Sequence, residues 1–67
     1  MSKTIIAHYT ISNSFGLVMY EISDERVTVA WSDELEKTHT RKLYYAKRGP
    51  YFILNDTRYY LDEFMRV

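Results

Sequence analysis

Hydrophobic and polar residues alternate along most of the chain, which is the period expected of half-buried β-strands. In the first half, this alternation predicts strands at residues 5–11, 18–22 and 27–31. Short polar segments suited to tight turns separate these strands, at residues 13–16 and 23–25. We therefore predict an antiparallel meander in the first half of the chain.

The alternation stops between residues 32 and 39, where the spacing of Asp33 and Glu36 matches a weak capping box. This spacing indicates a loop or a single helical turn. The alternation returns at residues 40–46 and predicts a fourth strand there. After that strand, Gly49 and Pro50 lie in a segment that turns the chain.

A hairpin is predicted around Asn55 and Asp56, because both residue types tolerate a positive φ and suit a two-residue loop between strands. The expected register pairs Leu54 with Thr57, Ile53 with Arg58, Phe52 with Tyr59, and Tyr51 with Tyr60. Cross-strand partners share a face of a sheet, so the face with Phe52 and Tyr59 is expected to point inward. The other face carries two tyrosines and an arginine and is expected to be half solvated.

The last residues allow a second interpretation. Hydrophobic residues at positions 60, 61, 64 and 65 recur at helical spacing, so a helix beginning near Thr57 is an alternative to the strand. In either case we expect a short C-terminal helical turn from Asp62.

The fold class that follows is all-β and mainly antiparallel, with residues 1–67 in a single small domain. We expect a barrel or bent sheet of five or six strands, SH3-like or OB-like in size. The expected core consists of Ile5, Ala7, Tyr9, Ile11, Val18, Tyr20, Ile22, Val27, Val29, Trp31, Leu43, Phe52, Leu54, Tyr59, Leu61 and Phe64.

The amino-acid composition indicates the cellular environment that we expect for this protein. The chain has no cysteine, so it can form neither a disulfide nor a thiolate metal site, which favours a reducing, cytoplasmic environment. No hydrophobic run approaches the length of a membrane span, and we expect a soluble protein that does not contact membranes.

The net charge of zero conceals an asymmetry between the two halves. Up to Glu36 there are two basic and six acidic residues, whereas from Lys37 onward there are seven basic and three acidic residues. The basic half could attract a polyanion, or it could attract the acidic half of a second molecule of this protein. Homodimer formation through pairing of edge strands is therefore a further possibility.

Catalytic chemistry has little support in the sequence. His8 and His39 are the only histidines, and no motif places either beside a nucleophile and an orienting third group. The acidic residues around Asp33 lack the glycine and the ligand spacing of a calcium loop. We predict that the protein is not an enzyme and uses no cofactor or metal.

The run from Arg48 to Leu54 shares part of the basic, glycine and aromatic order of RNA-recognition and cold-shock motifs. However, Pro50 stands where the first aromatic residue belongs, and Tyr51 stands where the second glycine belongs. We therefore assign no family on this run.

The candidate binding residues lie between residues 41 and 61, where five of the seven tyrosines alternate with arginine and lysine. Tyrosine rings can stack on bases, and the cations can neutralise phosphates, although tyrosine is also common in ordinary β-sheet packing. The expected binding face comprises Lys42, Tyr44, Lys47, Arg48, Tyr51, Arg58 and Tyr60.

This pattern predicts a non-enzymatic binding module whose first partner class is nucleic acid, with single strands favoured. The alternative is a protein partner on the same face, because tyrosine and arginine are enriched at interface hot spots. In that case the chain would act as an inhibitor or regulatory protein, of the kind that phages and mobile elements carry as small accessory proteins.

Overall fold

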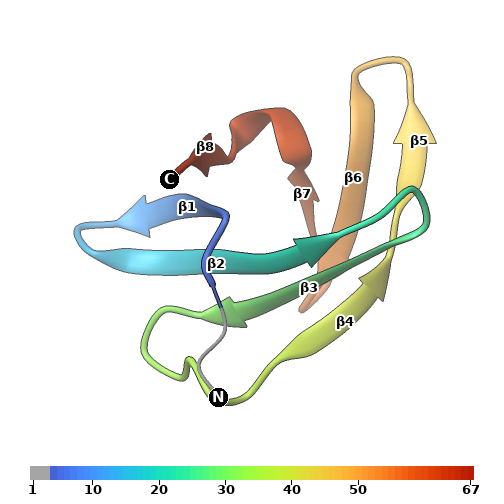
Figure 1. The fold of residues 1–67 in the computed structure, drawn as a ribbon. Helices are drawn as coiled ribbons and strands as arrows, with labels where there is room; N and C mark the ends of the chain where they lie inside the picture. Colours follow the sequence, from blue (N-terminus) through green and yellow to red (C-terminus); the bar gives the residue numbers. More distant parts are fainter. Residues whose placement is uncertain (1–3) are drawn as a thin grey trace.

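The computed structural model describes residues 4–67, which form a mostly antiparallel β structure with eight strands and one short 3-10 helix (Figure 1). Strands account for 61% of these described residues and helix for 5%. The elements are β1 (Ala7–Ser12), β2 (Phe15–Ile22), β3 (Arg26–Trp31), β4 (His39–Lys42), β5 (Tyr44–Ala46), β6 (Gly49–Leu54), β7 (Thr57–Tyr60), the 3-10 helix η1 (Leu61–Glu63) and β8 (Met65–Arg66). Among these residues no helix has the length and apolar character needed to cross a membrane.

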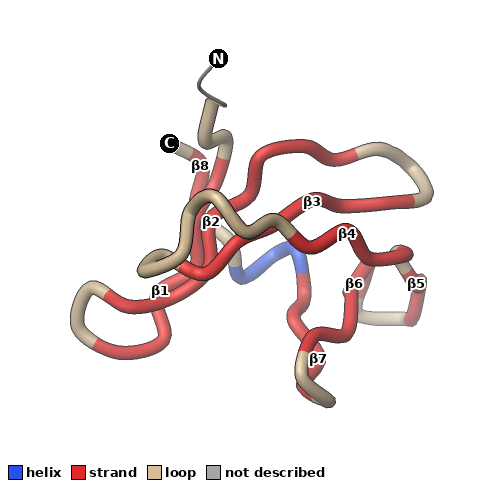
Figure 2. Tube along the Cα trace, turned by 90° about the horizontal axis from the view of Figure 1, so that it is seen from below, coloured by secondary structure: helices blue, strands red, loops and turns tan. Residues whose placement is uncertain are grey.

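The strands form two sheets. The first has five strands in the order β4-β3-β2-β1-β8, and the second has three strands in the order β5-β6-β7. In Figure 1 the strands of the second sheet run steeply across the long β2–β3 hairpin, and Figure 2 shows the second sheet to one side of the first. The described strands do not close into a barrel.

The hydrophobic core draws residues from both sheets, because neither sheet can bury its apolar face alone. The largest fully buried side chains are Leu17, Val27 and Val29 from the first sheet, and Phe52 and Leu54 from the second. Burial of each such side chain contributes about 1.5–3 kcal/mol. The inward face predicted for the second sheet, with Phe52 and Tyr59, is confirmed because both belong to this core.

The two-residue turn at Asn55 and Asp56 is confirmed, with φ angles of 53° and 60° at these two residues. The register between β6 and β7 is the predicted one, in which Tyr51 lies opposite Tyr60 and Phe52 lies opposite Tyr59. Local turn geometry thus determines which side chains lie together on each face of this hairpin.

The predicted fourth strand, at residues 40–46, is divided into β4 and β5. β4 pairs with β3 in the first sheet, whereas β5 pairs with β6 in the second sheet. Leu43 lies at the junction with 5% of its surface exposed, and its backbone N–H donates to the carbonyl of Glu25 over 2.8 Å. The chain changes sheets here because Leu43 packs into the core. This division and the added β8 raise the strand number above the predicted five or six.

Of the core residues predicted on β2, Val18 is confirmed as buried, whereas Tyr20 and Ile22 are not buried. Leu17 and Met19 belong to the core cluster, whereas Val18 is buried on the opposite face together with its cross-strand partner Ala30. The pairing with β3 shifts between Met19 and Glu21, so the extra residue, Tyr20, interrupts the alternation. Tyr20 is half-buried and Ile22 is 47% exposed, so neither lies in the predicted core.

A second irregularity lies at the β1–β2 turn, where the register shifts between Thr10 and Ser12. Ile11 falls at this shift and is 46% exposed instead of buried as predicted. Gly16 lies opposite Thr10, and a Cβ atom there would collide with the backbone carbonyl of Tyr9. The two strands approach closely at this point because residue 16 is a glycine.

Five other residues that were predicted to be in the core are only partly buried. Ile5 is half-buried and outside the core cluster. The larger side chains at the margin pack against the cluster without being fully buried, and these are Tyr9, Trp31, Leu61 and Phe64.

The C-terminal residues form neither a helix from Thr57 nor a free end. β7 leads into η1, which begins at Leu61, one residue before the expected helical turn. β8 then pairs with β1, with Ala7 opposite Arg66. The segment between β3 and β4 is a loop without helix, as one of the two interpretations allowed.

Candidate binding surface on the three-stranded sheet

Three tyrosines form a row across the second sheet, one from each strand. Tyr44 of β5 lies opposite Tyr51 of β6, and Tyr51 lies opposite Tyr60 of β7. The ring centroids are 5.6 Å apart for Tyr44 and Tyr51, and 5.2 Å apart for Tyr51 and Tyr60. We call this row the tyrosine ladder.

The ladder lies on the outer face of the sheet. Alternate residues of β6 and β7 point to opposite faces, so Phe52 and Tyr59 enter the core while Tyr51 and Tyr60 face outward. Tyr44 is 44% exposed, and the other two rings are half-buried. The Tyr44 end of the ladder is therefore the more open to a ligand.

Three cations contact the rings of the ladder. The guanidinium carbon of Arg48 is 4.1 Å from the Tyr60 ring centroid, and that of Arg58 is 4.9 Å from the Tyr51 centroid. The Nζ atom of Lys42 is 5.8 Å from the Tyr44 centroid. In such cation–π contacts the positive charge is attracted to the negative face of the aromatic ring. The pKa of Arg58 is raised, first by a side-chain hydrogen bond with Tyr60 and then by electrostatic interaction with Tyr51.

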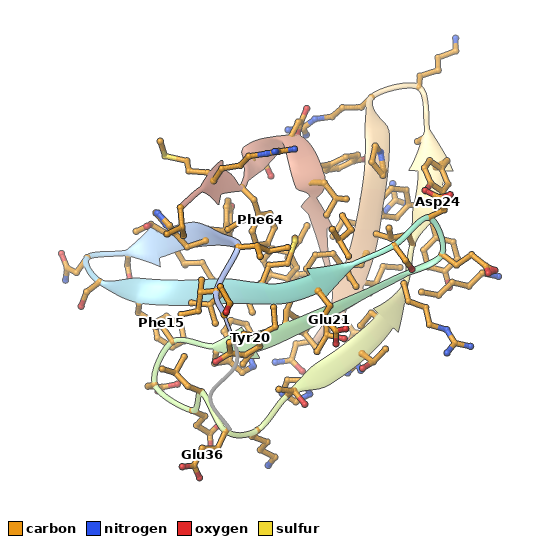
Figure 3. The ribbon with its side chains drawn as sticks, in the orientation of Figure 1. Phe15, Tyr20, Glu21, Asp24, Glu36 and Phe64 are labelled. Atoms are coloured by element: carbon orange, nitrogen blue, oxygen red, sulfur yellow. The ribbon has the colours of Figure 1, made fainter. Side chains whose placement is uncertain are left out.

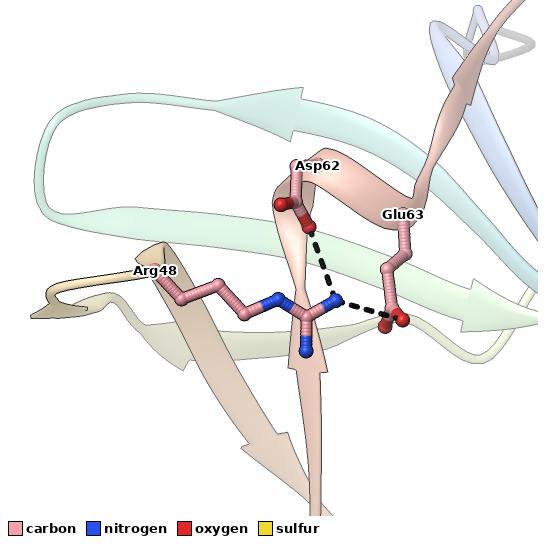
Figure 4. A network of polar contacts seen from close by, with 3 residues as sticks. All are labelled: Arg48, Asp62 and Glu63. Carbon is pink, nitrogen blue, oxygen red and sulfur yellow. Dashed lines mark ion pairs between the residues drawn. The ribbon is translucent and has the colours of Figure 1, made fainter.

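Arg48 also pairs with two carboxylates from η1 (Figure 4). Its Nη2 atom lies 2.9 Å from Glu63 Oε2 and 3.6 Å from Asp62 Oδ1. The hydrogen bond with Glu63 is the largest cause of a raised pKa at Arg48. These two acids offset the positive charge at the Tyr60 end of the ladder.

The structure brings together six of the seven predicted site residues, all except Lys47. Lys47 is exposed in the turn between β5 and β6, directly before Arg48 in the sequence. Lys42 was expected on the same strand as Tyr44, but it belongs to β4 of the other sheet. It still reaches the Tyr44 ring, because Leu43 alone separates the two residues.

Sequence reasoning missed the acids that flank the ladder. Asp62 was expected only to begin a short helical turn, and nothing in the spacing of Asp62 and Glu63 indicates contact with Arg48. It also missed Tyr45, which is 64% exposed and donates a hydrogen bond of 2.6 Å to the carbonyl of Asp24. Figure 3 shows Asp24 at the β2–β3 turn beside β5. This bond joins the β2–β3 turn of the first sheet to β5, an edge strand of the second sheet.

The described side chains form no candidate metal site. Within residues 4–67, no three histidine or acidic side chains are grouped so that they could hold a metal ion. The tyrosine ladder offers a ligand an aromatic surface, cations next to the rings, and a margin that carries both signs of charge.

Comparisons with protein-family models, with curated proteins and with solved structures found no match for this chain.

Proposed function

We propose that the protein is a non-enzymatic module that binds single-stranded nucleic acid on the tyrosine ladder. The observation that carries the proposal is the row formed by Tyr44, Tyr51 and Tyr60, with a cation over each ring. Stacking of a base on an aromatic side chain contributes about 1–3 kcal/mol and tolerates any sequence.

The arrangement of the rings suggests where a base would lie. Tyr51 is flanked by the other two rings, and one face of Tyr60 is covered by Arg48. Tyr44 is the most exposed of the three and lies within reach of Lys42. We therefore expect the first base to stack at Tyr44, with its phosphate near Lys42.

Single strands are favoured over duplexes because their bases are free to stack. Bases inside a duplex must first be unstacked and unpaired, which costs a few kcal/mol. A sheet of three short strands offers little surface to offset that cost.

A titration of labelled single-stranded and double-stranded oligonucleotides over a range of salt tests the proposal. Three cations near the ladder, Lys42, Lys47 and Arg58, form no ion pair with another described residue. If each neutralises one phosphate, log K falls against log salt with a slope of about −2 for single strands. Absence of binding at low salt, or a preference for duplex, would contradict the proposal.

A protein partner on the same surface is the second candidate. The observation in its favour is that Asp62 and Glu63 border the ladder, so the surface carries both signs of charge. Exposed tyrosine and arginine are typical of interface hot spots. A nuclease-treated pull-down in which Tyr44→Ala loses the partner, without salt-dependent oligonucleotide binding, would favour this function.

We also infer that the two sheets act as halves of a small open barrel, SH3-like or OB-like in size. The passage of one chain segment from β4 through Leu43 into β5 supports this inference.

A further inference from the structure

The core opens to solvent between β2, the residues before β1, and the C-terminal η1–β8 segment. A pocket of about 480 Å³ lies at this opening. Its floor includes Ala7 and Met19, which belong to the core and are 6% and 3% exposed. Figure 3 labels Phe64, another lining residue, which lies in the η1–β8 segment close to β1.

The walls of this pocket expose large apolar side chains. Ile22 and Ile6 are 47% and 38% exposed, and Leu61 completes the apolar lining. Covering such surface gains about 25 cal/mol per Å². Small-molecule pockets commonly measure about 300–1,000 Å³ and have mainly apolar walls with few polar groups. The opening has both properties.

Among the described residues that line the pocket, Arg66 is the charged one. It lies on β8 opposite Ala7, and within residues 4–67 it forms no ion pair with an acidic side chain. The acids of the nearby η1 helix, Asp62 and Glu63, contact Arg48 instead. The pocket thus combines an apolar interior with an uncompensated cation at its margin.

We propose that this pocket binds a free alkyl carboxylate, the chemistry of a medium-chain fatty acid. The alkyl chain lies against Met19, Ile22 and Phe64, and the carboxylate pairs with Arg66. The apolar lining excludes a fully polar ligand, because its polar groups would lose hydrogen bonds to water without replacement. The arginine favours an anionic head over a neutral one.

Calorimetric titration with decanoate, below the concentration at which it forms micelles, tests this site. We expect saturable binding of one molecule per chain. Each buried methylene contributes about 0.8 kcal/mol, or about fourfold in affinity, so octanoate should bind about 15-fold more weakly than decanoate. Decanol, which lacks the charge, should also bind more weakly than decanoate.

Two pairs of variants test the apolar lining and the arginine of the pocket separately. Ile22→Glu should abolish decanoate binding, whereas Ile11→Glu should retain it, because Ile11 has nearly the same exposure, 46% against 47%, and lies outside the pocket. Arg66→Ala should weaken decanoate binding by about two- to fivefold. The same change should leave decanol binding unaltered, and Arg66→Lys should restore most of the loss.

Circular dichroism of each variant checks that it remains folded, and Ile22→Ala serves as a milder change should Ile22→Glu unfold. The proposal is wrong if the wild type does not bind decanoate. It is equally wrong if chain length has no effect on affinity, or if the folded Ile22 and Ile11 variants bind alike.

Discussion

Arg48 lies with its guanidinium carbon 4.1 Å from the centroid of the Tyr60 ring. The same guanidinium is paired with Glu63 and Asp62, so the ring is covered by a cation whose charge is already offset. At the other end of the ladder, Lys42 approaches Tyr44 and forms no ion pair with another described residue. The two ends of one aromatic row therefore differ in the charge that they offer to a ligand.

Tyr44→Ala should weaken single-strand binding by about 1–3 kcal/mol, because it removes the most exposed ring of the ladder. Tyr45→Ala is the matched control, since Tyr45 is the next residue of the same strand and points to the opposite face. Fluorescence anisotropy with a labelled oligonucleotide measures both affinities. Equal losses for the two variants would mean that the ladder face is not the contact surface.

The double variant Asp62→Asn, Glu63→Gln should strengthen nucleic-acid binding at low salt. It frees Arg48 to contact a phosphate, which should steepen the salt slope by about 0.7. The control is Asp33→Asn with Glu34→Gln, which changes the net charge by the same amount on the distant β3–β4 loop. If both double variants show the same slope, the gain comes from net charge and not from Arg48.

Phe52→Ala should lower the free energy of unfolding by about 3–5 kcal/mol, because it leaves a cavity at a fully buried position. In a chain this short, a single hydrophobic core rarely supplies more than about 3–5 kcal/mol of net stability, so much of the variant should unfold. Ile53→Ala, at the neighbouring residue, should cost far less because Ile53 is 39% exposed. Urea denaturation of both variants measures the difference, and comparable midpoints would place Phe52 outside the core.

Alkaline pH should destabilise the fold partly through Tyr59. Burial is the main cause that raises the pKa of its phenol, while a hydrogen bond with Thr57 acts in the opposite direction. A tyrosine in the unfolded chain loses its proton near pH 10, before the folded one does. The stability from the neutral phenol is therefore complete below about pH 10 and is lost as the pH rises through the folded pKa.

Thermal denaturation between neutral and strongly alkaline pH checks this dependence. Tyr59→Phe cannot ionise, so its melting temperature should fall less steeply above about pH 10 than that of the wild type. A steep fall that persists in Tyr59→Phe would assign the effect to other groups.

The register of the β6–β7 hairpin and the side chains on its outer face were predictable from the sequence, because both depend on residues that are close together along the chain. The pairing of Tyr51 with Tyr60 follows from the turn at Asn55 and Asp56, because a two-residue loop allows only one register. The predicted site residues of this hairpin consequently share a face. The core predictions for Ile11, Tyr20 and Ile22 were wrong because strict alternation does not anticipate a bulge.

The sequence by itself determined the β class, the register of the β6–β7 hairpin and the row of outward tyrosines on it. All three follow from alternation and turn chemistry over fewer than a dozen residues. Only the tertiary structure decided that Leu43 divides a strand between two sheets, that β8 pairs with β1, and that Glu63 contacts Arg48. Each of these features depends on contacts between segments that are far apart in the sequence. A local pattern of residues does not contain the energy of such contacts, so it cannot predict them.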